Sequence, residues 1–287
     1  MSFPTFLINL LYGFTIGSTL ILISSSLSLI FGVMGVINLA HGAFCMLGAY
    51  FGLTLVLWTG NFWLALIVAP IIVAVIGCLL EIYTLRPLYG LDHMLQLFLT
   101  LGLSMVMSNL VLQIWGGDVR SVTIPEALKG NVLILGTVYP SFRLFVFAVT
   151  IFLVFSIWFL ITQTRWGIIL RAGIHNMELV DAFGINISRV LTLVFALGCG
   201  LASVAGVIIG AMHNCNINMH ADLLNWGLIA VVIGGLGSFR GAVIGSLILG
   251  VSEAFGALLV PGLAKFTIYA VMVGVLIFRP EGLLKEV

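Results

Sequence analysis

The chain has 287 residues, of which 62% are hydrophobic and only 7% are charged. Soluble domains carry about 25% charged residues, so the composition excludes an ordinary soluble domain. The formal net charge is +1 and no basic block is present, which excludes the electrostatic pattern of a nucleic-acid-binding protein. The composition predicts a multi-pass, all-α membrane protein folded as one transmembrane domain over residues 1–287.

The first 80 residues contain no Asp, Glu, Lys or Arg, and the first charged residue is Glu81. A cleaved signal peptide would have a basic segment before its apolar core. No such segment precedes the first apolar run of this chain. We therefore expect that run to remain as a membrane span.

A helix needs roughly 20 apolar residues to cross a hydrocarbon core of about 30 Å. Cuts at polar, glycine and proline clusters divide the chain into nine candidate spans, or eight if the short seventh one re-enters the membrane. The predicted spans are 7–31, 35–57, 62–85, 93–115, 143–163, 190–212, 223–238, 240–260 and 263–279.

Lys and Arg near span ends favour the cytoplasmic side, so Arg279 and Lys285 predict a cytoplasmic C-terminus. Parity then predicts an external N-terminus. Residues 116–142 are predicted as an outer loop and residues 164–189 as a cytoplasmic loop. The predicted inner basic residues are Arg86, Arg165, Arg171, Arg189, Arg240, Arg279 and Lys285, and the outer ones are Arg120, Lys129, Arg143 and Lys265.

Glycines at a spacing of four let helices approach closely in lipid. Packing is therefore the expected role of three pairs: Gly13/Gly17, Gly48/Gly52 and Gly206/Gly210. Residues 32–42 and 234–241 instead crowd glycines beside polar groups, which predicts interrupted helices. Non-helical backbone at membrane depth must be buried or line a water-filled path, and two such breaks can mark a transport route. His-Gly-Ala at 41–43 and Arg-Gly-Ala at 240–242 make an internal duplication a hypothesis.

The candidate residues for a transport path combine these breaks with polar groups inside the spans. They are Asn38, His41, Gly42, Gly235, Gly237 and Glu253. An intramembrane His is a functional candidate, and the alternative for Asn38 and His41 is a buried hydrogen bond that links two helices. Glu253 is expected to face protein or a cavity, because a lipid-exposed carboxylate costs about 2.5 kcal/mol or more.

Residues 172–184 show apolar residues at every third position, with polar residues on another face. The apolar set is Ile174, Met177 and Val180, and the polar set is His175, Glu178 and Asp181. This pattern predicts a short amphipathic helix on the membrane surface, and the alternative is a solvated connector. Gly184 can end the helix in a left-handed conformation, and Asn186 can begin the next one.

Motifs for catalysis are absent from the sequence. The three lysines follow Leu, Ala and Leu, so no P-loop is present, and the chain also lacks His-Glu-x-x-His, Gly-x-Ser-x-Gly and Gly-x-Gly-x-x-Gly. We therefore expect no enzyme activity and no cofactor in this chain. His213, Cys215 and His220 match no standard zinc spacing, which favours a polar turn over a membrane-embedded metal protein.

Four motifs in this order resemble the smaller permease subunit of bacterial branched-chain amino acid ABC transporters. They are Asn-Leu-Ala-His-Gly at 38–42, Arg-Ala at 171–172 with Gly-Ile-Asn at 184–186, Gly-Gly-Leu-Gly-Ser at 234–238 with Gly-Ala-Val-Ile-Gly at 241–245, and Arg-Pro-Glu-Gly-Leu at 279–283. The resemblance implies an importer of branched-chain or similar hydrophobic amino acids in the bacterial inner membrane. It would work by alternating access.

The resemblance also implies partners: a second homologous permease, two cytoplasmic ATPase subunits that bind ATP and Mg, an extracytoplasmic solute-binding protein, and membrane lipid. It implies an ATPase-docking loop that contains Arg171, Ala172, Glu178, Asp181 and Gly184. Two features depart from the family pattern: Asp181, and Phe239-Arg240 within the late series of glycines at 237, 241 and 245.

Two alternatives remain beside the amino acid importer. Relatives of this permease type carry urea, short amides or aromatic acids, so the cargo can differ. A stand-alone secondary transporter or channel would instead need coupling residues within this chain, for which His41 and Glu253 are the candidates.

Overall fold

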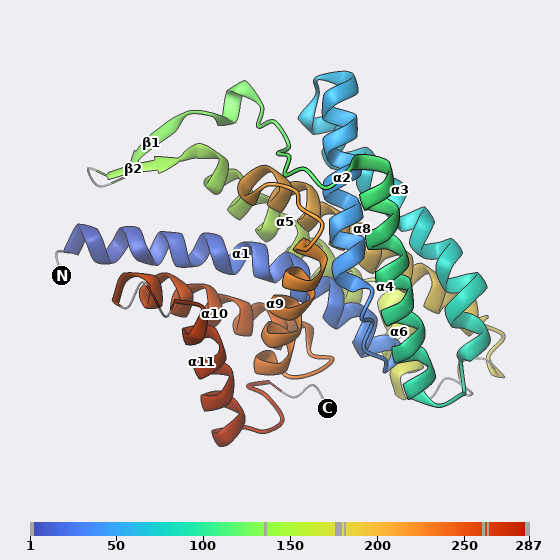
Figure 1. The fold of residues 1–287 in the computed structure, drawn as a ribbon. Coiled ribbons are helices and arrows are strands. Elements are labelled where there is room, and N and C mark those ends of the chain that lie inside the picture. Colours follow the sequence, from blue (N-terminus) through green and yellow to red (C-terminus); the bar gives the residue numbers. More distant parts are fainter. Residues whose placement is uncertain are drawn as a thin grey trace.

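The computed structural model describes residues 3–134, 137–175, 180, 182–259, 262 and 264–284. Within them the chain is almost entirely helical (Figure 1). The helices are α1 (Phe3–Met34), α2 (His41–Thr59), α3 (Phe62–Leu80), α4 (His93–Trp115), α5 (Ser141–Gln163), α6 (Arg165–His175), α8 (Ile187–His213), α9 (Met219–Gly234), α10 (Phe239–Leu259) and α11 (Ala264–Phe278).

Short elements complete the fold. A π-helical turn, Glu81–Leu85, and a 3-10 turn, Arg86–Leu88, extend α3. The predicted outer loop, 116–142, contains a 3-10 turn, Glu126–Leu128, and an antiparallel hairpin of β1 (Asn131–Ile134) and β2 (Thr137–Pro140). The all-α class is therefore confirmed, with one small hairpin outside the spans.

Seven helices of the described chain are long and apolar enough to cross a membrane: α1, α2, α3 with its extension, α4, α5, α8 and α10. The other two predicted spans correspond to the shorter apolar helices α9 and α11. With 16 residues, α9 is about 24 Å long, which is less than the hydrocarbon core of about 30 Å. A helix thus lies at each of the nine predicted positions.

Two predicted spans had wrong boundaries. The second span was expected from residue 35, but α2 begins at His41 because Gly35 leaves the helical region with φ of 70° and Asn38 Oδ1 caps the amide of Ala40 at 3.0 Å. The seventh span was expected at 223–238, but α9 runs from Met219 to Gly234. Its polar first turn is helical, and Gly235, with φ of 112°, ends it.

The most buried spans are α2 and α8, which pack on each other at the centre of the molecule. The two helices can approach closely because glycine has no side chain: a Cβ on Gly206 would lie 1.8 Å from the carbonyl oxygen of Cys45. All three predicted glycine pairs face another helix, which confirms their packing role. Gly13/Gly17 face α10, Gly48/Gly52 face α8, and Gly206/Gly210 face α2.

The outer helices α3, α4 and α5 leave most of their surface exposed in the isolated chain. Large apolar side chains stand on these surfaces, among them Ile67, Phe98 and Phe152 at 64%, 64% and 68% exposure. Contiguous apolar surface of this extent needs lipid or another protein against it. The arrangement is that of a buried two-helix centre surrounded by lipid-facing or partner-facing helices.

The basic residues of the described chain lie at two opposite ends of the helical bundle. Arg86 bonds to the carbonyl of Ser188, and α6, the end of α1 and residues 236–240 surround one cavity. We call this end the basic end; its arginines are Arg86, Arg165, Arg171, Arg189, Arg240 and Arg279. Figure 1 shows the β1–β2 hairpin near the N-terminal part of α1, and we call this opposite end the hairpin end. There Tyr139 of β2 contacts Thr15 of α1, and Arg143 stacks on Tyr12. The six arginines belong to the set predicted as inner and Arg143 to the set predicted as outer, while Lys285 of the inner set lies outside the described residues.

Candidate functional site

The first break in the helices lies between α1 and α2, at residues 35–40. His41, fully buried, places Nε2 at 2.9 Å from Ser26 Oγ and 3.2 Å from the carbonyl oxygen of Ile23. Ile23 precedes the end of α1 at Met34 by eleven residues, or about 16 Å. The chain therefore turns back along α1, and α2 begins deep inside the molecule.

Asn38 and His41 form the local hydrogen bonds of this break. The carbonyl of Asn38 accepts from the amide of His41 at 3.1 Å, in addition to the cap on Ala40. The contacts of His41 with α1 match the helix-linking alternative. Within the described chain, Asn38 Nδ2 and His41 Nδ1 are buried without a hydrogen-bond partner. A role for either residue in a transport path stays a prediction.

The second break, residues 235–238, joins α9 to α10. Gly235 and Gly237 have φ of 112° and 83°, and Ser238 Oγ accepts from the amide of Gly241 at 3.0 Å. The amides of Leu283 and Leu284 donate to the carbonyls of Ile233 and Gly234, each at 2.9 Å. The C-terminal segment thus satisfies carbonyl groups that the end of α9 leaves open.

The end of α1 lies against the second break. A Cβ on Gly32 would come within 2.9 Å of the carbonyl oxygen of Gly237. The motifs at 234–238 and 279–283 therefore meet at the basic end, beside Gly32 of the first glycine-rich segment, which lies 205 positions before Gly237 in the chain. The remaining path candidates lie elsewhere. Gly42 packs on the backbone of His220, and half-buried Glu253 lies 14 residues into α10, about 21 Å from its start.

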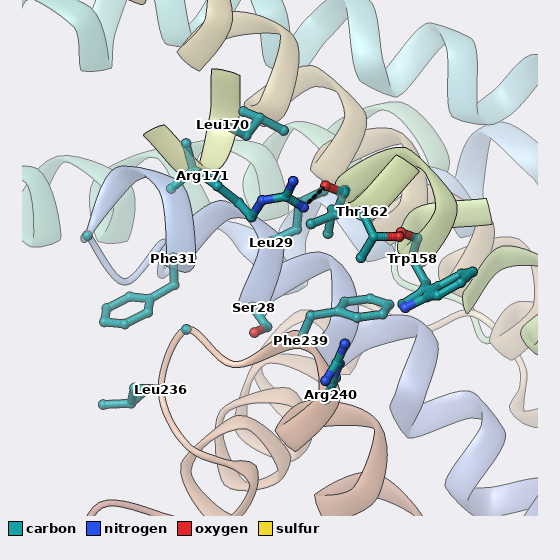
Figure 2. A pocket seen from close by; sticks show the side chains of 15 residues that line it. Ser28, Leu29, Phe31, Trp158, Thr162, Leu170, Arg171, Leu236, Phe239 and Arg240 are labelled. Atoms are coloured by element: carbon teal, nitrogen blue, oxygen red, sulfur yellow. Dashed lines mark hydrogen bonds between the residues drawn. The ribbon is translucent and has the colours of Figure 1, made fainter. Parts of the chain in front are cut away.

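A cavity of about 570 Å³ opens beside this junction (Figure 2). Figure 2 shows Arg171 reaching toward it from α6 and Arg240 from α10. Arg171 Nη1 donates to the carbonyl of Ile161. The lining residues are Ser28, Leu29, Phe31, Gly32, Val33, Gly35, Trp158, Ile161, Thr162, Leu170, Arg171, Leu236, Gly237, Phe239 and Arg240. Of the predicted site residues, the structure brings Arg171 and Gly237 together here.

The predicted coupling loop is only partly described. Arg171 and Ala172 are exposed on α6, whereas Glu178 and Asp181 lie outside the described residues. Residues 176–179 and 181 of the helix expected at 172–184 also lie outside the described residues. The described part of this loop starts with α6 at Arg165, where Thr164 Oγ1 accepts a hydrogen bond from the amide of Gly167 at 3.2 Å. The capping predictions are confirmed: Gly184 has φ of 79°, and the side chain of Asn186 accepts from the amide of Arg189 at 3.1 Å.

Sequence reasoning missed a polar cluster around Glu81. Its carboxylate is fully buried and accepts hydrogen bonds of 2.6 Å from Tyr89 and from Thr192, while Arg86 Nη2 lies 3.5 Å away. Burial and the hydrogen bond to Glu81 raise the pKa of Tyr89, so its hydroxyl stays a donor. The π-helical turn positions these groups, as such turns often do at functional sites. The sequence feature that could have indicated this cluster is the carboxylate of Glu81 inside the predicted span 62–85.

The residues considered for the alternative metal site, His213, Cys215 and His220, lie where α8 ends and α9 begins. Cys215 is buried and pairs its backbone with that of Arg120, and burial raises the pKa of its thiol to about 12. His220 Nδ1 lies 2.7 Å from the carbonyl oxygen of Ile217, which is one turn of backbone away. Among the residues that the structure describes, no three His, Cys, Asp or Glu side chains are grouped to hold a metal ion.

Comparison with known proteins agrees with the fold and the motifs. The family model "Branched-chain amino acid transport system / permease component" matches residues 9–276. The high-affinity branched-chain amino acid transport system permease protein BraD of Pseudomonas aeruginosa is 33% identical, covering 97% of this chain and 95% of that protein. The corresponding protein LivH of Escherichia coli is 28% identical, covering 98% and 96%.

A solved structure shows the same architecture. PsaBC from Streptococcus pneumoniae, in complex with Fab, superposes with a TM-score of 0.50 and 12% sequence identity, covering 93% of this chain and 89% of that chain. At this identity the likeness concerns the fold alone. The family model spans nearly the whole sequence, so the chain belongs to the family of permease components of branched-chain amino acid transport systems.

Proposed function

We propose that this chain is the transmembrane permease subunit of an ATP-driven importer for branched-chain or similar hydrophobic amino acids in the bacterial inner membrane. The complete importer would add a second homologous permease, two cytoplasmic ATPase subunits and an extracytoplasmic solute-binding protein. ATP and Mg would bind to the ATPase subunits, because this sequence has no P-loop. The names of BraD and LivH support the choice of cargo.

The observation that carries this proposal is the exposed end of the loop between α6 and α8. Phe183 is 78% exposed and stands beside Gly184 at the basic end. An aromatic side chain in this position can insert into a groove of a partner protein. The same loop leads directly into α8, one of the two most buried spans. A force applied to the loop would therefore reach the centre of the molecule.

The distribution of arginines supports the orientation. Six arginines of the described chain lie at the basic end, and cytoplasmic loops of membrane proteins carry an excess of Lys and Arg. We infer that the basic end, with the loop 164–189 and the C-terminus, faces the cytoplasm. The hairpin end would then face the solute-binding protein.

The contacts of α8 suggest how a displacement would travel. Asn186 caps the start of α8, and six residues later Thr192 binds the carboxylate of Glu81. The first turns of α8 are thereby attached to the extension of α3. We infer that docking and closure of the ATPase subunits move α8 together with this extension, in alternating access.

The test is co-purification of the tagged chain from its native membrane, with Phe183→Asp compared with wild type. The variant should lose the ATPase subunits, while Leu133→Asp at the hairpin end, where Leu133 is 75% exposed, should keep them. Reconstituted complexes should import leucine only with ATP and binding protein. Leucine uptake by the chain alone would contradict the proposal and favour a stand-alone transporter. Preferential uptake of urea or an aromatic acid would correct the cargo.

A further inference from the structure

The cavity at the basic end lies where several helices stop. It is bounded by the last turns of α1 and α5, by α6 and by residues 236–240. The ends of spanning helices mark the boundary between hydrocarbon and lipid head groups. The cavity therefore lies at the level of the phosphate groups of one leaflet. Its volume of about 570 Å³ is that of a small-molecule site rather than a packing defect.

The lining combines an apolar wall with positive charge. Leu29, Leu170 and Phe239 belong to the wall, and Arg171 and Arg240 carry the charge. No Asp or Glu is among the lining residues that the structure describes, and neither arginine has a carboxylate partner in that part of the chain. A guanidinium has five N–H donors, so the single bond from Arg171 leaves donors available.

A second feature points to a ligand. Ser28 lines the cavity, is 1% exposed, and its Oγ has no hydrogen-bond partner within the described chain. Other serines of α1 bond to the preceding turn, as Ser18 does with Phe14 and Ser26 with Leu22. A buried hydroxyl without a partner is costly, so an acceptor from outside the chain is expected in the cavity.

We propose that the cavity binds the phosphate of an anionic glycerophospholipid, held by Arg171, Arg240 and the hydroxyl of Ser28. A free anion would not need the apolar wall, whereas a lipid brings acyl chains to cover it. Trp158 lines the cavity and contacts Phe155 at 5.7 Å between ring centroids. Phe155 in turn stacks on Phe159.

These aromatic rings extend the cavity onto α5. Phe155 and Phe159 are 59% and 49% exposed, and Phe152, one turn nearer the hairpin end, is 68% exposed. An acyl chain that leaves the cavity can lie along this surface. Basic pockets between spans are known to select anionic head groups. The site is additional to the proposed import function and does not depend on the direction of transport.

The experiment uses the full chain in nanodiscs that contain equal amounts of phosphatidylglycerol and phosphatidylcholine, released for native mass spectrometry. Wild type should retain phosphatidylglycerol in preference to phosphatidylcholine. Arg171→Gln and Arg240→Gln should each lower the phosphatidylglycerol-bound fraction about fivefold. Arg240→Lys should keep most of it. The matched control is Arg189→Gln, which changes an exposed arginine of the basic end that does not line the cavity.

Three results would overturn the lipid site: equal retention of the two lipids, an equal loss with Arg189→Gln, or displacement of the lipid by millimolar inorganic phosphate or leucine. The last result would assign the cavity to a free anion or to the cargo. If the glutamine variants do not fold, Ser28→Ala provides the test, because it removes only the hydroxyl. It should weaken phosphatidylglycerol retention without changing phosphatidylcholine retention, and no change in either would also reject the proposal.

Discussion

Glu81 shows how much one buried side chain can connect in this protein. Its two oxygens bind Tyr89 and Thr192, and Arg86 stands beside them. A buried carboxylate is tolerated only when several donors satisfy it. Here those donors come from the turn after α3 and from α8. The residue therefore joins two segments that are 111 positions apart in the sequence.

Replacement of Glu81 should be more damaging than replacement of its partly exposed ion-pair partner. Glu81→Ala removes the acceptor of the Tyr89 hydroxyl and leaves Thr192 bonded only within α8, to the carbonyl of Ser188. Because the link between α8 and the extension of α3 is lost, we expect a loss of about 2–4 kcal/mol in the free energy of unfolding. Arg86→Ala leaves both hydroxyl bonds in place and should cost less. Thermal unfolding of the purified variants in detergent measures the difference. Equal melting temperatures for Glu81→Ala and wild type would contradict this account of the cluster.

Cys215 should resist alkylation in the folded protein. Burial raises the pKa of its thiol to about 12, and only the thiolate is nucleophilic. The thiol therefore stays protonated at pH 8 and remains largely so at pH 10. A cysteine placed at Val119, which is 67% exposed, should react quickly under both conditions. Maleimide labelling of variants with one cysteine, followed by mass spectrometry, checks this; rapid labelling of folded Cys215 would show that the site is open.

Helix contacts in the centre depend on the absence of side chains rather than on large apolar surfaces. Helices in lipid gain little from the hydrophobic effect, so close packing must hold them together. Gly206 contacts the backbone of Cys45 so closely that no Cβ can be accommodated without moving α2 or α8. In contrast, Gly102 of α4 has no neighbouring atom within 4 Å of a Cβ position.

This contrast makes a matched pair of substitutions. Gly206→Ala should destabilise the protein by about 1–3 kcal/mol, because overpacking forces the two helices apart. Gly102→Ala should be neutral or slightly stabilising, since alanine has the higher helix propensity. Melting temperatures of the two variants in the same detergent give the comparison. If both variants had the same melting temperature as wild type, the contact between α2 and α8 would not be as close as the structure indicates.

Local chemistry made the left-handed glycine at 184 and the start of α8 predictable. Gly184 adopts positive φ at little cost, and Asn186 has a side chain of the right length to cap a helix. The start of α6 was not predicted, because Thr164 was not considered as a cap. The start of α2 was misplaced because hydropathy continues through the break, so the apolar pattern does not mark where the chain turns back.

The separation of charge between the two ends predicts the orientation of the whole molecule. Green fluorescent protein fused to the C-terminus should be fluorescent, because the basic end is expected in the cytoplasm, where this protein folds. Alkaline phosphatase inserted after Lys129, at the hairpin end, should be active because it requires export. The opposite pair of results would reverse the orientation. The assignment of residues to the basic end and the hairpin end would not change, because it rests on contacts within the chain.

The sequence by itself determined the membrane class, the nine helical positions and the two glycine-rich breaks. Lipid cannot satisfy backbone hydrogen bonds, so long apolar runs must be helical, and clustered glycines interrupt them for local reasons. Only the tertiary structure decided that α2 begins beside Ile23, that Glu81 meets Thr192, and that Arg171 and Arg240 share a cavity. These features depend on how distant segments pack, and hydropathy within one segment contains no information about its neighbours in space.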